Sequence, residues 1–269
     1  QTALDNSQVA GYSFKDEAGN PISLSTSELP KTQALWSPRV GFNWDVLGDR
    51  SVQVRGGTGI FSGRPAFVWI SNQMSNNGIL TGSLRDDNTT GEYPFSPDVT
   101  KYNLPPNPGQ PASSYNIAVS DPEFKYPQTW KTNIAVDKTL PYGIIATAEF
   151  IYNKEINNVT YINANLEPAN GTLSGPDNRP TYPGLGLSGT PQNIASRVND
   201  NITDAILLKN TNKGKGYSAT IKLERPTTRG LSAMVAYNYS NTKDLMSAGS
   251  IAFSSWRDNF SVNGNNLPT

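Results

Sequence analysis

Apolar and polar residues alternate in three pairs of short segments along the chain. A short turn joins the two members of each pair, and long polar stretches separate one pair from the next. Because successive side chains of a β-strand point to opposite faces, this alternation predicts strands that each have one apolar and one polar face. The predicted strands span residues 39–46 and 51–60, 130–138 and 144–152, and 217–224 and 231–240. We therefore expect the chain to be built from antiparallel hairpins.

The apolar residues of two paired strands must lie on one face of the sheet, and this requirement limits the possible registers. The expected cross-strand pairs are Trp44 with Val54, Val136 with Ile144, Trp130 with Phe150, Leu223 with Leu231, and Tyr217 with Tyr237. Each pairing leaves an odd loop of about three or five residues, which is a common hairpin class. Suitable turn residues are Gly48 and Asp49, Pro141 and Gly143, and Pro226 and Gly230.

The two faces of the predicted strands differ in chemistry. The charged side chains that share one face are Asp45, Arg55, Lys131, Asp137, Glu149, Lys222 and Glu224. The aromatic side chains on the other face are Trp44, Trp130, Phe150, Tyr152, Tyr217, Tyr237 and Tyr239. This division is typical of a membrane barrel, in which charges face a lumen and aromatic rings form girdles at the level of the lipid headgroups. Alternation alone also fits a soluble β-sandwich, whose apolar face would be its core.

The connections between the hairpins favour the barrel. Residues 62–127 and 164–203 are long, polar and rich in proline and glycine, and unstructured connections of more than about 15 residues are uncommon in compact soluble domains. Short turns facing the periplasm and long extracellular loops are typical of outer-membrane barrels. The expected fold is therefore all-β, an antiparallel up-and-down transmembrane β-barrel that is partial, with about seven strands.

Two further segments have less regular patterns. Helical periodicity is weak throughout, and residues 194–208 are the only helix candidate. The tail of that segment with the residues after it, TDAILLKNTNKGKGYS at 203–218, is better explained as a strand and a glycine-containing turn that lead into Tyr217. Residues 255–263, SWRDNFSVN, resemble the start of another strand.

Composition excludes several classes of protein. The 269 residues include no histidine and no cysteine, so histidine- or cysteine-based catalysis, zinc sites with such ligands, and disulfides are excluded. The formal net charge is zero, and nothing indicates a nucleic-acid partner. No segment approaches the run of about 20 apolar residues that a membrane helix needs. We expect a protein that is not an enzyme and that has no cofactor and no metal site.

The ends of the sequence suggest a segment of a larger barrel. The first residues, QTALDNSQVAGYSF, contain neither a basic region nor an apolar region of an export signal, and the last residues, NGNNLPT, follow the strand-like segment without a closing strand. We expect residues 1–269 to form one segment of a barrel, without a signal peptide and without a plug domain.

Four stretches carry a resemblance to a known family. The run from Trp36 to Gln73, WSPRVGFNWDVLGDRSVQVRGGTGIFSGRPAFVWISNQ, resembles the barrel of TonB-dependent outer-membrane receptors, in particular the Oar-like members of Bacteroidetes. Residues 127–143, 208–226 and 230–244 are similar to the same barrels. The plug, the TonB box, the carboxypeptidase-like N-terminal extension and the terminal aromatic strand of those receptors have no counterpart in this sequence.

The resemblance implies an active importer of a scarce ligand. Such a receptor has a barrel of about 22 strands filled by an N-terminal plug, on which TonB pulls. The implied partners are outer-membrane lipid, the remainder of the barrel and its plug, TonB acting through the plug, and a surface lipoprotein. The competing hypothesis is a secreted or surface-exposed β-sandwich that binds glycans or mediates adhesion.

Aromatic and arginine side chains in the connections are the best candidates for ligand contact, because these residue types dominate binding hot spots. The candidates are Arg64, Phe67, Trp69, Tyr93, Tyr102, Tyr115, Trp256 and Arg257. The other explanation is that these rings pack the connections against one another. The ligand is left open among an iron chelate, a cofactor, an oligosaccharide and a peptide.

Overall fold

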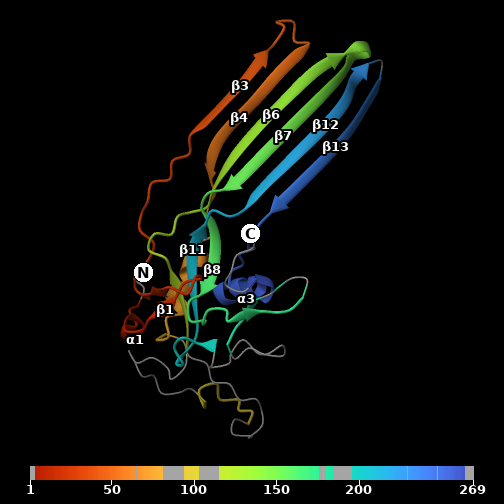
Figure 1. Cartoon of the computed structure of the whole chain (residues 1–269). Coiled ribbons are helices and arrows are strands. Elements are labelled where there is room, and N and C mark those ends of the chain that lie inside the picture. Colours follow the sequence, from red (N-terminus) through yellow and green to blue (C-terminus); the bar gives the residue numbers. More distant parts are fainter. Residues whose placement is uncertain are drawn as a thin grey trace.

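The computed structural model describes residues 4–64, 66–80, 94–102, 115–175, 178, 180–183, 196–228, 230–246 and 248–263. A six-stranded antiparallel sheet forms one part of the molecule, and the long connections fold at one end of it (Figure 1). We call this second part the loop layer; it consists of the described residues within 4–37, 63–127, 156–214 and 244–263. No helix in the described ranges is long and apolar enough to span a bilayer.

The six-stranded sheet contains all six strands predicted from the alternation. In chain order they are β3 (Arg39–Asp45), β4 (Val52–Ser62), β6 (Gln128–Leu140), β7 (Ile144–Glu155), β12 (Lys215–Thr228) and β13 (Leu231–Lys243). Their order across the sheet is β13-β12-β7-β6-β4-β3, and neighbouring strands are antiparallel. The sheet is open, with β3 and β13 as its edges in the described part of the chain (Figure 1).

The registers confirm one of the three predicted hairpins and correct the other two. Trp44 lies opposite Val54, as predicted. The predicted pairs of the second hairpin are wrong: Val136 pairs with Ala148, so β7 is displaced by four residues. The third hairpin is displaced by the same amount. Its observed pairs are Leu223 with Val235 and Tyr217 with Asn241. An even displacement leaves each side chain on its predicted face.

The turns explain these displacements. In the second hairpin the ladder continues to Leu140, which pairs with Ile144, and the chain reverses through the 3₁₀ turn Pro141–Gly143. Tyr142 and Gly143 there have φ values of 65° and 70°. In the third hairpin, β12 continues past a register irregularity that contains Pro226, a position where the missing N–H of proline is tolerated. Alternation constrains only the parity of a pairing, whereas the turn decides how far the ladder extends.

The loop layer contains a three-stranded mixed sheet, which the sequence did not predict. Its central strand β11 (Ile202–Thr211) pairs antiparallel with β8 (Asn158–Asn163) and parallel with β5 (Tyr115–Ser120). The position of β11 confirms the strand predicted before Tyr217. The connections 62–127 and 164–203, expected to lack regular structure, therefore supply β5 and part of β11.

One continuous ribbon joins the two sheets. β8 follows β7 after two residues, and β12 follows β11 after three. Gly214 lies in this short break with φ of 112°, and a Cβ there would lie 2.8 Å from Cγ of Glu155. The amide of Glu155 donates a hydrogen bond of 3.0 Å to the carbonyl of Gly214. Both strands thus continue from the large sheet into the loop layer, where β8 and β11 pair again.

Short elements cover both faces of the three-stranded sheet. They are the helices α1 (Ser7–Ala10), α2 (Val68–Ser75) and α3 (Ala252–Asn263), the hairpin of β1 (Phe14–Lys15) and β2 (Pro21–Ile22), and the hairpin of β9 (Gly171–Thr172) and β10 (Pro180–Thr181). On one face, Val9 and Phe14 of the N-terminal segment pack with Ile117, Ile162 and Leu207.

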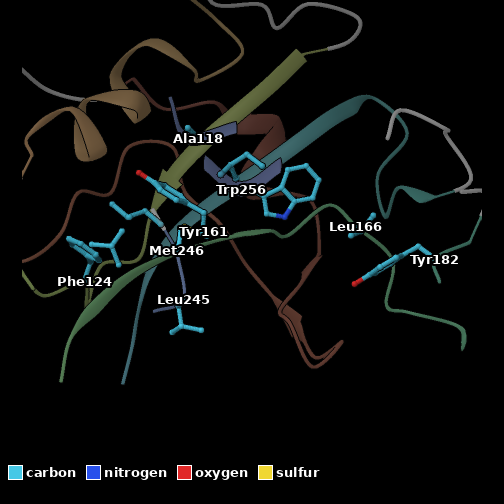
Figure 2. Close-up of a cluster of buried hydrophobic side chains, with 12 residues drawn as sticks. Ala118, Phe124, Tyr161, Leu166, Tyr182, Leu245, Met246 and Trp256 are labelled. Atoms are coloured by element: carbon cyan, nitrogen blue, oxygen red, sulfur yellow. The ribbon is translucent and has the colours of Figure 1, made fainter. Parts of the chain in front are cut away.

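On the other face, Trp256 of α3 is 1% exposed and lies in a cluster with Tyr161 and Leu208 (Figure 2). The prediction of a strand at 255–263 is therefore wrong. Ala252 and Ser255 are buried with Trp256, and this spacing of three and four residues is that of a helix face.

Asp204 is a carboxylate inside the loop layer. It lies on β11 with 2% of its surface exposed, and Nδ2 of Asn163 donates a hydrogen bond of 2.9 Å to its Oδ1. Burial raises the pKa of Asp204 to about 6, although the charge of Arg197 and the hydrogen bond from Asn163 act in the opposite direction. Burial disfavours the charged form of a carboxyl group, so ionisation of Asp204 weakens the loop layer.

The burial of Trp256 generates a first prediction. Trp256→Ala should destabilise the loop layer by about 3–5 kcal/mol, because the removed ring leaves a cavity in its core. The rate of limited proteolysis within the loop layer, in the whole protein in detergent, measures the effect. Phe67→Ala removes a ring that is 61% exposed and should change stability by about 0.5 kcal/mol or less. Equal proteolysis of the two variants would contradict the proposed core.

The raised pKa of Asp204 generates a second prediction. Because the folded pKa of about 6 exceeds the ordinary aspartate value of 3.8, the loop layer should be most stable below about pH 4 with respect to this group. It should then lose up to about 3 kcal/mol as the pH rises to 6. Asp204→Asn should remove this component from the pH profile of protease resistance, and Asp5→Asn, at an exposed position, should retain it. A wild-type profile in Asp204→Asn would exclude Asp204 as the titrating group.

Candidate functional site

Charged side chains form a connected group on the polar face of the large sheet. Nε of Arg55 on β4 donates a hydrogen bond of 2.9 Å to Oδ2 of Asp137 on β6. Nη1 of Arg55 lies 3.6 Å from Oε1 of Glu149 on β7, and Oγ1 of Thr147 donates to Asp137 across 2.6 Å. The registers place all seven predicted charged residues on this face. The predicted polar face is confirmed.

The apolar face has no cover. Trp44, Ile134 and Val235 are 59%, 48% and 73% exposed, and the described residues supply no second layer over this side of the large sheet (Figure 1). A β-sandwich would bury these side chains between two sheets, so the sandwich hypothesis is wrong. An apolar surface of this extent needs an apolar environment or a partner.

An aromatic band crosses the apolar face near the loop layer. The rings of Trp130 and Tyr152 are 6.1 Å apart between centroids, and Tyr217 lies 6.4 Å from Phe150 and 6.2 Å from Tyr239. Five of the seven predicted rings therefore lie in ring-to-ring contacts, Trp130 with Tyr152 and Tyr217 with Phe150 and Tyr239. Trp44 lies apart from them, at the end of the sheet where the short turns are.

The slope of this band gives the tilt of the strands. Successive pairings place Tyr239 on β13 directly across the sheet from Ile134 on β6, and Ile134 is four residues from Trp130 along β6. Four residues correspond to about 13 Å along a strand, and the three strand spacings between β6 and β13 to about 14 Å. For the band of rings to lie parallel to the membrane plane, the strands must be tilted by about 43° from the barrel axis. This agrees with the tilt of about 35–45° found in membrane barrels.

A cavity of about 730 Å³ lies where the apolar face meets the loop layer. Val40, Ile60, Trp130 and Lys154 line it. Nε1 of Trp130 donates a hydrogen bond of 2.7 Å to Oγ1 of Thr58, another lining residue. Its apolar walls suit an elongated apolar group, and its charged lining residues are Arg39, Lys154 and Glu155. The sequence did not predict this cavity, although Lys154 interrupts an apolar alternation at the end of β7 and was a signal for it.

Two predicted ligand-binding rings are packed inside the loop layer. Tyr115 and Trp256 are buried, one on each face of the three-stranded sheet, and burial raises the pKa of the Tyr115 hydroxyl. Trp69 of α2 is half-buried against the cluster that contains Trp256. These three rings therefore pack the connections together, and Tyr115 and Trp256 offer no exposed ring face to a ligand.

The remaining predicted ligand-binding residues do not converge. Arg64 and Phe67 are exposed after β4. The hydroxyl of Tyr102 donates to the carbonyl of Pro94. The guanidinium of Arg257 lies 5.6 Å from the ring centroid of Phe253 and 3.6 Å from Oδ1 of Asp258. Tyr93 lies outside the described residues. None of the seven described candidates lines the cavity, and their contact with a ligand stays a prediction.

A metal centre has no support in this part of the molecule. Within the described ranges, the acidic side chains form no group of three or more that suits a metal ion. The chain has no histidine or cysteine to supply other ligands.

Comparison with known proteins agrees with this geometry. A family model described as an outer membrane beta barrel domain matches residues 4–268. No curated protein matches the sequence. The family explains the uncovered apolar face as the surface that meets lipid and the charged face as the lumen side. This chain belongs to the outer membrane β-barrel domain family, and its location is the outer membrane.

Proposed function

We propose that this chain supplies part of the wall and the extracellular loops of an active transport receptor that takes up a scarce ligand with energy delivered through TonB. In this proposal the chain is not an enzyme. The observation that carries it is the combination of a sheet that is charged on one face and uncovered and apolar on the other with a folded loop layer at one end only.

The asymmetry of the connections supports the orientation. The three hairpin turns lie together at one end of the sheet, and the loop layer lies at the other (Figure 1). Outer-membrane barrels have short turns in the periplasm and long loops outside. The loop layer is therefore placed outside the cell, where it meets the ligand first.

The open edges support a wide barrel. β3 and β13 have unpaired outer sides in the described part of the chain, and such edges inside a membrane must pair with further strands. Barrels of about 22 strands hold a plug in the lumen. We infer that the remainder of the barrel pairs with these edges and that a plug contacts the lumen side.

The charged group around Arg55 suits such a plug. Asp137 and Glu149 pair with Arg55 on the lumen side, while the side chains of Lys131 and Asn133 extend the same polar surface along β6. A polar plug can exchange hydrogen bonds with this surface when it moves. The resemblance of residues 36–73 to TonB-dependent receptors supports the same mechanism, with TonB acting on the plug and a surface lipoprotein as a further candidate partner.

Binding of TonB tests this function. The whole receptor, purified in detergent, should bind the periplasmic domain of TonB in isothermal titration calorimetry. In planar bilayers it should conduct ions only after urea displaces the plug. The control is the same receptor without its TonB-contacting segment, which should not bind. A steady open-pore conductance without TonB binding would identify a passive pore and contradict the proposal.

The assignment of faces generates a matched pair of substitutions. Ile134→Arg puts a charge on the lipid face near mid-depth and should cost about 2–4 kcal/mol, because the guanidinium loses its hydration in the hydrocarbon. Asn133→Arg puts the same charge on the lumen side of the same strand and should cost about 1 kcal/mol or less. Unfolding of the whole receptor in guanidinium chloride, followed by gel mobility, measures the difference. Equal costs would contradict the assignment.

A further inference from the structure

A row of three lysines lies on the lipid face beside the loop layer. Lys215 on β12 pairs with Lys154 on β7 and with Lys243 on β13. Lys215 and Lys243 come from the two strands of one hairpin and Lys154 from a distant segment, and the register of the strands brings the three together. We call them the lysine row.

The lysine row carries three positive charges on an exposed surface. All three side chains are exposed, and within the described part of the chain none of them forms an ion pair. Neighbouring strands lie about 4.8 Å apart, and like charges directly opposite each other destabilise a sheet. The row therefore favours an anion that contacts more than one ammonium group.

The position of the row specifies where that anion lies. Tyr152 and Tyr217 pair with each other, and Lys154 and Lys215 lie two residues from them toward the loop layer. Lys243 lies four residues beyond Tyr239 on β13 in the same direction. Aromatic rings mark the boundary between hydrocarbon and headgroups, and lysine side chains extend from it into the headgroup region. The ammonium groups therefore lie on the headgroup side of the aromatic band, with Lys154 nearest to the band and Lys243 farthest from it because the strands are tilted.

The cavity provides a place for the apolar part of the same molecule. Lys154 belongs to the lysine row and also lines the cavity of about 730 Å³. From Lys154 the cavity extends toward β3 and β4, where Val40 and Ile60 supply apolar walls. A lipid acyl chain fits these walls, and its headgroup would lie next to the row.

We propose that the lysine row and the cavity together bind a phosphorylated glycolipid of the outer leaflet. Its phosphates contact Lys154, Lys215 and Lys243, and one acyl chain lies against Trp130 in the cavity. The site is on the outside of the wall and is separate from the lumen. The lipid-binding proposal depends on the outer-membrane location and not on TonB. A negative result for lipid binding would therefore leave the transport proposal intact.

The test uses the whole receptor in detergent and bisphosphorylated lipid A as the probe, with bound lipid counted by native mass spectrometry. Replacing the three lysines of the row with glutamine should weaken binding about 100-fold, because each lysine near an anionic headgroup contributes a similar share. The control variant replaces Lys125, Lys131 and Lys138 with glutamine. These three lysines are exposed outside the lysine row, so the control loses the same number of positive charges. It should bind as the unchanged receptor does.

Two further arms identify the source of the phosphate and the role of the cavity. Dephosphorylated lipid A should bind weakly and equally to the unchanged receptor and the row variant. Trp130→Ala should weaken the binding of both lipids. Inorganic pyrophosphate should compete only weakly with lipid A for the unchanged receptor. Equal binding of lipid A to the row variant and the control variant would overturn the proposal. Pyrophosphate binding as tight as that of lipid A, with no effect of Trp130→Ala, would show a free-anion site and overturn it too.

Discussion

The hydrogen-bond ladder of the six-stranded sheet is the constraint on which the other features depend. The pairings between β3 and β13 keep the outward-facing residues of neighbouring strands on one face, because a displacement by one residue would move a whole strand's apolar set to the lumen. In hydrocarbon the backbone groups have no water to bond with, so the ladder must also satisfy them. The division of the sheet into two faces follows from this one ladder.

The loop layer depends on the same ladder through the ribbon that leaves the sheet. β7 and β12 pair up to the lysine row, and after the break at Gly214 the chain pairs again as β8 and β11. The N-terminal segment and α3 then bury the two faces of this extension. The extracellular connections thereby form a layer with its own core, which orients the surface that a ligand meets. Tyr115 and Trp256 belong to this core and are not available for contact with a ligand.

Three zones follow one another along the lipid face. Aliphatic side chains such as Ile134 and Val136 occupy the middle of β6, the band around Trp130 and Tyr217 follows, and the lysine row comes next to the loop layer. This order matches the change from hydrocarbon through the interface to charged headgroups. The cavity beside Trp130 lies at the last boundary, where a lipid presents an acyl chain and a phosphate to the same surface.

The sequence by itself determined the six strands, their faces and their hairpin order, because a period of two is a local property of each segment. It also excluded catalysis by histidine or cysteine. The displacement of two hairpins by four residues was decided by the ladder and the turns, since parity does not distinguish registers that differ by an even number.

The parallel pairing of β5 with β11, the helix α3 and the burial of Trp256 were decided only by the tertiary structure. The lysine row belongs with them. Lys154 is far from Lys215 and Lys243 in the sequence, and the three become neighbours only in the register in which β7, β12 and β13 pair. Such contacts depend on which distant segments meet, and a local pattern of apolar and polar residues contains no information about that choice.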